Sequence, residues 1–101
     1  MPAESKLEST VISYARQRGI LTYKWVSPAH RGVPDRIFIF PTGVVLFCEF
    51  KAPGKRPTPL QEKTIVKMVR QGCLVAVIDN STAAYDIIDK LLTKKCTISD
   101  K

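Results

Sequence analysis

The sequence predicts an α/β fold with the element order α-β-β-β-α-β-α, in which helices flank a central mixed sheet. Three observations support this prediction. Helical hydrophobic periodicity occurs in three separate segments. Two apolar runs joined by a short Pro- and Gly-containing turn are typical of a β-hairpin. A continuous apolar run between the last two helical segments is typical of a buried strand.

The first predicted helix begins with Ser5-Lys6-Leu7-Glu8, which has the form of a capping box, and it continues to about Arg18. Gly19 ends it. A strand is predicted at residues 20–26, followed by a loop at residues 27–34. The inner face of the helix is apolar and consists of Leu7, Val11, Ile12, Tyr14 and Ala15.

The hairpin follows, with apolar runs at residues 37–40 and 44–48 on either side of the turn Pro41-Thr42-Gly43. A three-residue turn with its glycine in the left-handed conformation pairs Phe40 with Val44. A two-residue turn would shift this register. Both faces of the hairpin are apolar, so we expect the sheet to be covered on both sides.

Three charged residues lie at the open end of this hairpin. In the predicted register Asp35 is opposite Glu49, with Cβ atoms about 5 Å apart, and Lys51 points to the same face. Facing carboxylates at a poorly hydrated rim repel. Either one takes up a proton, or Lys51 compensates, or a divalent cation lies between them. The structural alternative is that Asp35 caps a turn after Pro34, while Glu49 and Lys51 form an edge salt bridge.

A loop at residues 52–57 leads to the second helix, which begins at Thr58 with Pro59 at the favoured first position and ends at Gly72. Residues 73–78 form a continuous apolar run that is typical of a buried strand.

The last helix is predicted to begin at Ser81 and to continue to about Leu92. Its inner positions are Ala84, Ile88 and Leu91. The tail after Thr93 carries no clear signal. The sequence contains no repeat or low-complexity linker, and its length suits one domain over residues 1–101.

The chain is basic, with 16 Lys and Arg against 9 Asp and Glu and a formal net charge of +7. This charge favours a polyanionic partner, nucleic acid first and an anionic membrane surface second, although solubility alone also explains it. No segment forms a basic amphipathic helix with an aromatic face, which weakens the membrane alternative.

The apolar runs are shorter than the roughly 18 residues that span a bilayer, and no signal segment precedes the first helix. We therefore expect an intracellular, cytoplasmic protein. Cys48, Cys73 and Cys96 are odd in number and lack C-x-x-C spacing, which argues against a disulfide framework and a zinc site. Cys48 and Cys73 lie in apolar runs and are interpreted as core residues.

Three segments carry a resemblance to a known family: "YKWVSPAHRGVPDR" at residues 23–36, "FCEFKAPGKRPTPLQ" at 47–61 and "QGCLVAVID" at 71–79. A bare D-x(n)-E-x-K pattern is weak, but the Gly-x-Pro before Asp35 and the Pro-Leu-Gln that ends at Gln61 make it specific. The sequence resembles the VRR-NUC family of the PD-(D/E)XK nuclease superfamily, particularly its stand-alone phage and bacterial domains. The resemblance covers the chain to about residue 90 and implies a restriction-endonuclease-like core.

The resemblance implies a Mg²⁺- or Mn²⁺-dependent endodeoxyribonuclease that needs no organic cofactor. Asp35 and Glu49 match the family's carboxylate ligands, and the backbone carbonyl of Phe50 completes the set. Lys51 matches the residue that orients or deprotonates the attacking water and stabilises transition-state charge. Phosphodiester hydrolysis needs this combination, because a cation bound by carboxylates activates water and offsets phosphate charge.

Two further residues have a structural and a functional interpretation. Glu8 is explained by a capping box, but it also matches the carboxylate that the family's first helix places near the metal. Gln61 is explained by a second capping box that starts at Thr58, but it also matches a glutamine near the family's site.

Several basic residues near these motifs are candidate DNA contacts: Lys24, Arg31, Arg36, Lys55 and Arg56. Ordinary solvated charge is the alternative for each. His30 is interpreted as structural or solvent-exposed, and Trp25 as a core residue, with base stacking as its alternative.

By resemblance, the expected function is a structure-selective endonuclease that resolves Holliday junctions as a homodimer, in a bacterial cytoplasm or in the host cytoplasm if the protein is phage-encoded. A two-fold dimer presents two sites for two symmetric cuts. The alternatives are a flap, fork or nicking nuclease and, in another class, a non-catalytic basic DNA-binding module.

Overall fold

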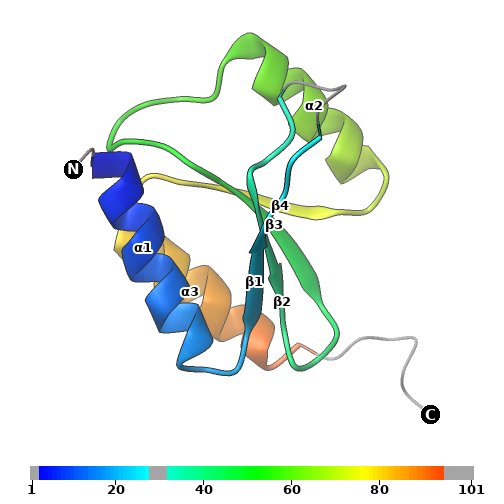
Figure 1. Cartoon of the computed structure of the whole chain (residues 1–101). Coiled ribbons are helices and arrows are strands. Elements are labelled where there is room, and N and C mark those ends of the chain that lie inside the picture. Colours follow the sequence, from blue (N-terminus) through cyan, green and yellow to red (C-terminus); the bar gives the residue numbers. More distant parts are fainter. Residues whose placement is uncertain (1–2, 28–31, 95–101) are drawn as a thin grey trace.

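The computed structural model describes residues 3–27 and 32–94. Its elements follow the predicted order (Figure 1): α1 (Ala3–Arg16), β1 (Leu21–Lys24), β2 (Arg36–Ile39), β3 (Val45–Phe50), α2 (Pro59–Arg70), β4 (Leu74–Ile78) and α3 (Ser81–Leu92). The predicted α/β fold class is therefore confirmed.

The sheet has the strand order β1-β2-β3-β4. β1 and β2 pair antiparallel, β2 and β3 pair antiparallel, and β3 and β4 pair parallel, so the sheet is mixed, as predicted. Helices α1 and α3 lie side by side on one face, and α2 lies on the other side near β4 (Figure 1). The crossover from β3 to β4 therefore runs through α2.

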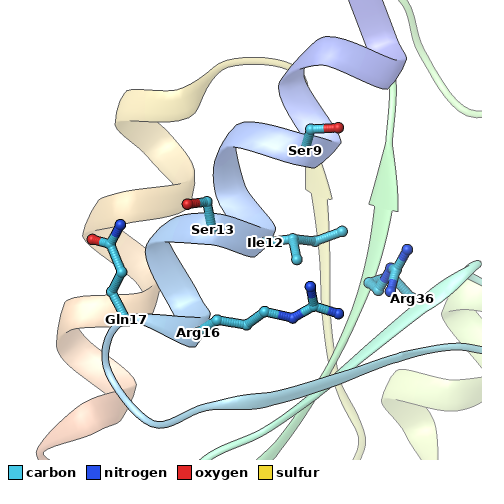
Figure 2. A pocket seen from close by; sticks show the side chains of 6 residues that line it. All are labelled: Ser9, Ile12, Ser13, Arg16, Gln17 and Arg36. Atoms are coloured by element: carbon cyan, nitrogen blue, oxygen red, sulfur yellow. The ribbon is translucent and has the colours of Figure 1, made fainter.

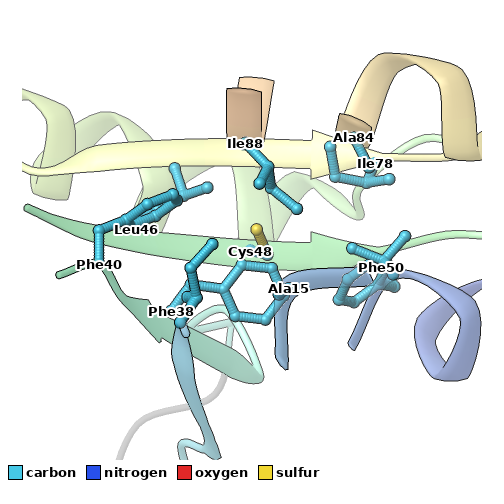
Figure 3. Close-up of a cluster of buried hydrophobic side chains, with 12 residues drawn as sticks. Ala15, Phe38, Phe40, Leu46, Cys48, Phe50, Ile78, Ala84 and Ile88 are labelled. Carbon is cyan, nitrogen blue, oxygen red and sulfur yellow. The ribbon is translucent and has the colours of Figure 1, made fainter. Parts of the chain in front are cut away.

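The core lies between the sheet and the α1–α3 pair (Figure 3). Phe38 and Phe50 are fully buried there, with their ring centroids 6.4 Å apart. The helices contribute small and branched side chains at the predicted inner positions. The buried apolar set is Val11, Ala15, Ile20, Phe38, Phe40, Leu46, Cys48, Phe50, Ala76, Ile78, Ala84 and Ile88.

The opposite face of the sheet is only partly covered, so the expectation of cover on both sides was wrong. Helix α2 contains no buried residue, and side chains on this face remain exposed, among them Leu21, Tyr23, Val45 and Val77. The same observation corrects the interpretation of residues 73–78 as a fully buried strand. β4 is an edge strand. Its apolar side chains point alternately to the two faces of the sheet, and one of these faces is partly exposed to solvent.

The hairpin has the predicted register. The amide of Phe40 donates to the carbonyl of Val44 at 2.9 Å, and Gly43 has the left-handed φ of +89°. Arg36 pairs with Cys48, so the next pair outward is Asp35 and Glu49. The three-residue turn therefore sets the two carboxylates face to face at the rim of the sheet.

Two of the predicted helix starts need correction. Helix α1 already begins at Ala3, so Ser5 lies inside the helix and is not its N-cap. Helix α3 is capped by Asn80, whose side-chain oxygen accepts from the amide of Ala83 at 2.8 Å, and not by Ser81. The predicted cap of α2 is confirmed, with Thr58 and Gln61 forming a reciprocal capping box.

Other predictions concern cysteines and membrane spans. Burial raises the pKa of the Cys48 thiol to about 12, as suits an inert core residue. Cys73 is half-buried, and both thiols are free, whereas Cys96 and the rest of the tail after Lys94 lie outside the described residues. None of the described helices is both long and apolar enough to cross a bilayer.

Candidate active site

Four polar side chains lie at the rim of the sheet where β2 begins and β3 ends. Asp35 directly precedes β2, and Glu49 lies near the end of β3, where Lys51 follows. Gln61 comes from the first turn of α2. The backbone carbonyl of Asp35 accepts a hydrogen bond from the amide of Trp25 at 2.9 Å, which extends the β1–β2 pairing and fixes this rim.

Glu49 is the centre of the contacts in this group. Its residue is only 5% exposed. Its Oε2 accepts from the side-chain amide nitrogen of Gln61 at 3.0 Å and lies 3.5 Å from Nζ of Lys51. The carboxylate is therefore oriented from two sides, by a neutral donor and by a positive charge.

Gln61 serves the cap and the site together. Its side-chain oxygen accepts a hydrogen bond from the backbone amide of Thr58 at 2.9 Å, and its backbone amide donates to the Thr58 hydroxyl at 3.2 Å. Its side-chain nitrogen remains for Glu49. The two interpretations of Gln61 are compatible, because the capping box uses one end of the amide and Glu49 the other.

Asp35 has a buried side-chain oxygen, Oδ1, that lacks a hydrogen-bond partner. Burial raises the pKa of Asp35 above its ordinary value, and the negative charge of Glu8 raises it further. Burial also raises the pKa of Glu49, with a further contribution from Asp35, against the lowering effect of Lys51. Each carboxylate is thus destabilised in its charged form by its surroundings and by another acid.

These features fit a hard divalent cation. Its charge would relieve the repulsion between Asp35 and Glu49, and the buried Oδ1 of Asp35 is an oxygen ligand without another partner. Within residues 3–27 and 32–94, no three carboxylate, histidine or cysteine side chains converge. Two carboxylates, a backbone carbonyl such as that of Phe50 and water suit Mg²⁺, which keeps several water ligands.

Glu8 lies beside this pair but is engaged elsewhere. Its Oε2 accepts from two guanidinium nitrogens of Arg36, Nε at 3.1 Å and Nη2 at 2.9 Å. Both side chains are largely buried. Because Ser5 is not an N-cap, the capping-box explanation of Glu8 was wrong. Its position is explained by the ion pair.

Comparisons with known proteins identify relatives of this chain. No protein-family model matches the sequence. A protein of Acyrthosiphon pisum secondary endosymbiont phage 1 named "Putative nuclease p44" is 42% identical over 77 residues, which are 76% of this chain and 83% of that protein. A solved structure described as "VRR_NUC domain" superposes with a TM-score of 0.82 at 23% identity, covering 88% of this chain and 97% of that one.

The chain belongs to the VRR-NUC family. The Gly-x-Pro that precedes Asp35 has a steric explanation in this VRR-NUC fold. Gly32 has a φ of +89°, and a Cβ there would lie 2.9 Å from the carbonyl oxygen of Leu60 and from the Thr64 hydroxyl. Pro34 is fully buried. The segment before Asp35 is therefore pressed against α2, which also carries Gln61.

The candidate DNA contacts of this VRR-NUC chain divide into three groups. Lys24, Lys55 and Arg56 are exposed, and the charge of Lys24 lowers the pKa of Asp35. Arg36 is only 9% exposed and is bound to Glu8, so its geometry does not support a phosphate contact. The predictions for Arg31 and His30 fall outside the described residues.

Two contacts in this VRR-NUC site had no signal in the sequence. Asp79, just after β4, accepts a hydrogen bond from the backbone amide of Gly54 at 3.2 Å. This bond connects the end of β4 to the loop that carries Lys55. Trp25 packs against Phe47 on the partly covered face, with ring centroids 4.9 Å apart. It is half-buried, which agrees only in part with the expected core position.

The raised carboxyl pKa values predict an unusual pH dependence of stability. The folded protein holds protons that the unfolded chain has lost above about pH 4. Stability should therefore fall as pH rises from there through the raised pKa values of Asp35 and Glu49. We expect Asp35→Asn to raise the melting temperature of the metal-free protein at pH 7–8, with the gain vanishing near pH 4. Thermal denaturation in EDTA measures this, and about 1 kcal/mol corresponds to 4–8 °C.

The same melting curves include a ligand control. Adding Mg²⁺ at pH 7–8 should stabilise the wild type, because the cation binds only the folded site, and should leave Asp35→Asn unchanged. Equal stabilisation of both proteins, or an equal effect of Asp35→Asn at pH 4 and pH 8, would contradict the assignment.

Proposed function

We propose that this protein is a divalent-metal-dependent endodeoxyribonuclease whose active site consists of Asp35, Glu49 and Lys51. The observation that carries the proposal is the pair of facing, desolvated carboxylates with a lysine 3.5 Å from one of them and an unpartnered buried oxygen on the other. A structural salt bridge needs only Glu49 and Lys51. It gives no reason to bury Asp35 beside them.

The residues divide the chemistry between them. Asp35 and Glu49 would hold Mg²⁺ or Mn²⁺, which supplies an activated water at neutral pH and a counter-charge for the phosphate. Lys51 orients the attacking water, takes up its proton or stabilises charge on the phosphate. Gln61 keeps Glu49 in place through its 3.0 Å hydrogen bond. The role of Glu8 is to add negative charge beside Asp35, with Arg36 holding its carboxylate.

DNA as the substrate is supported by charge. The chain carries a formal net charge of +7, and the exposed Lys24, Lys55 and Arg56 belong to segments that adjoin the carboxylates. Phosphate contacts of this kind supply affinity without sequence preference. Selection must then come from DNA shape, and we propose branched DNA, Holliday junctions first, with flaps and forks as the second candidates.

A panel of labelled junction, flap, fork, nicked and linear DNAs tests the proposal. We expect cleavage in Mg²⁺ or Mn²⁺ and none in EDTA, with the junction cut fastest. Preferred cutting of flaps or forks would replace the junction assignment while retaining the nuclease. A non-catalytic DNA-binding module is the remaining outcome, and it predicts binding that persists in EDTA without cleavage under any condition.

We further propose that the protein acts as a homodimer. The sheet face that α2 leaves partly open carries exposed apolar side chains, including Leu21, Tyr23 and Val45. They share this face with Asp35 and Glu49. A second copy is the occupant that suits symmetric cutting, because a two-fold axis parallel to the strands would place the two rims at the same end of the dimer.

Mixing experiments test the dimer. Sedimentation at micromolar concentration should give about twice the monomer mass for the wild type. The Tyr23→Glu variant should give the mass of a monomer. Val26→Glu, which changes an exposed apolar residue beyond the end of β1, is the matched control. Heterodimers of wild type and Asp35→Asn should nick one strand without resolving the junction. A monomer that makes both cuts would refute the dimer.

A further inference from the structure

A groove outside the carboxylate site runs along α1, between this helix and the β1–β2 edge of the sheet. It has a volume of about 570 Å³ and is lined by Ser9, Ile12, Ser13, Arg16, Gln17 and Arg36. Figure 2 shows Ile12 and Arg16 extending from α1 toward Arg36. Three of the lining residues carry a neutral hydrogen-bonding side chain, and two carry a guanidinium group.

The two arginines of the groove differ in their availability. Arg36 forms one wall, but its guanidinium is already bound to the carboxylate of Glu8. Arg16 is exposed, and no ion pair or side-chain hydrogen bond joins it to another described residue. The groove therefore presents one uncompensated positive charge beside hydroxyl and amide groups, a combination that suits a phosphate diester.

The groove lies next to the rim that carries the proposed active site, on the α1 side of the sheet, whereas Asp35 and Glu49 face the α2 side. Arg36 follows Asp35 in the chain, and its partner Glu8 acts on the pKa of Asp35. Lys24 pairs with Arg36 across β1 and β2, so it lies on the same face of the sheet as the groove. A nucleic-acid strand bound at the carboxylates would reach the groove by passing over the rim beside Lys24.

The length of the path can be estimated from helix geometry. Arg16 follows Glu8 by eight residues, which is about 12 Å along the axis of α1 at about 1.5 Å per residue. One strand of duplex DNA presents a phosphate about every 3.4 Å along its axis. A strand that runs parallel to α1 would therefore place Arg16 about three or four phosphates beyond Glu8.

We propose that this groove is a backbone subsite, in which Arg16 binds a phosphate of the DNA three or four nucleotides from the bond that is cut. Ser9, Ser13 and Gln17 also line the groove and provide neutral donors. The inference rests on the proposed function for the nature of the ligand, but it assigns a site and a position that the carboxylates do not define.

The experiment measures DNA binding by the cleavage-deficient variant Asp35→Asn at several salt concentrations, with and without Arg16→Ala. We expect Arg16→Ala to weaken binding about 5- to 10-fold at 0.1 M salt and to reduce the slope of log K against log salt by about 1. Lys90→Ala removes the same charge from α3, where Lys90 is exposed and paired with Asp86, and should have no such effect.

A second measurement locates the contact. Single neutral methylphosphonates are placed along each strand of the DNA. A substitution three or four nucleotides from the cut should weaken binding of the protein that retains Arg16 and have no further effect on Arg16→Ala. Equal effects of Arg16→Ala and Lys90→Ala, or a penalty at that position that persists without Arg16, would overturn the proposal. The salt-dependence readout needs no cleavage, so an inactive wild type would refute the nuclease while the binding data for Arg16→Ala and Lys90→Ala would still decide the subsite.

Discussion

Replacing Asp35 by Asn, or Glu49 by Gln, is expected to lower the rate of DNA cleavage by roughly a thousand-fold or more while DNA binding is retained or becomes tighter. Each change removes one of the two charges that would hold the cation and keeps the shape of the side chain. Losing a single electrostatic group at a transition state commonly costs about 10²- to 10³-fold, and here the activation of water is lost as well. Single-turnover cleavage and a separate binding assay measure the two effects.

The binding result distinguishes catalysis from folding. Asp35 and Glu49 repel each other and the DNA phosphates, so neutralising one of them should not weaken the complex. Asp86→Asn and Glu62→Gln apply the same chemical changes to exposed carboxylates of α3 and α2 and should cleave like the wild type. Full activity in Asp35→Asn or Glu49→Gln would remove these residues from the active site.

Lys51→Ala is expected to reduce turnover by about 10²- to 10³-fold without moving the Mg²⁺ concentration at half-maximal activity. The ammonium lies 3.5 Å from Oε2 of Glu49, close enough to act on a water or phosphate at the same cation. Its charge would stabilise the transition state and is not itself a ligand. Metal titrations of the cleavage rate separate the two effects, because a ligand would shift the midpoint and a catalytic lysine lowers the plateau.

Two further lysine variants sharpen this result. Lys51→Arg keeps the charge and should recover part of the rate, although its planar group cannot take up a proton from water. Lys90→Ala should behave as the wild type. An unchanged plateau in Lys51→Ala, or a shifted midpoint with the plateau intact, would contradict the assigned role.

The sequence was sufficient to predict the order of helices and strands and the pairing of Asp35 with Glu49. The reason is local: a three-residue turn ending in Gly43 fixes the register, and strict alternation along a strand then decides which side chains share a face. The same logic predicted the cap of α2, because Thr58, Pro59 and Gln61 lie within a single turn. Features determined by neighbours in the chain were thus within reach.

Features that depend on tertiary contacts could not be predicted from the sequence. Arg36 was expected to contact DNA, but it is turned to the core side of the sheet and bound to Glu8, which lies 28 residues away in the chain. Nothing in the spacing of either residue indicates that pair. The partial exposure of β4 was also missed, because an apolar run predicts burial but does not reveal that α2 leaves part of the face open.

The central claim is that Asp35 and Glu49 together hold a divalent cation, and the most direct test is anomalous diffraction from crystals grown with Mn²⁺. We expect one peak between the two carboxylates, within about 2 Å of an oxygen of each, with Oδ1 of Asp35 among its ligands. The peak should be absent from crystals of Asp35→Asn. Wild-type crystals at saturating Mn²⁺ that show no peak there, with Lys51 still paired to Glu49, would contradict the claim.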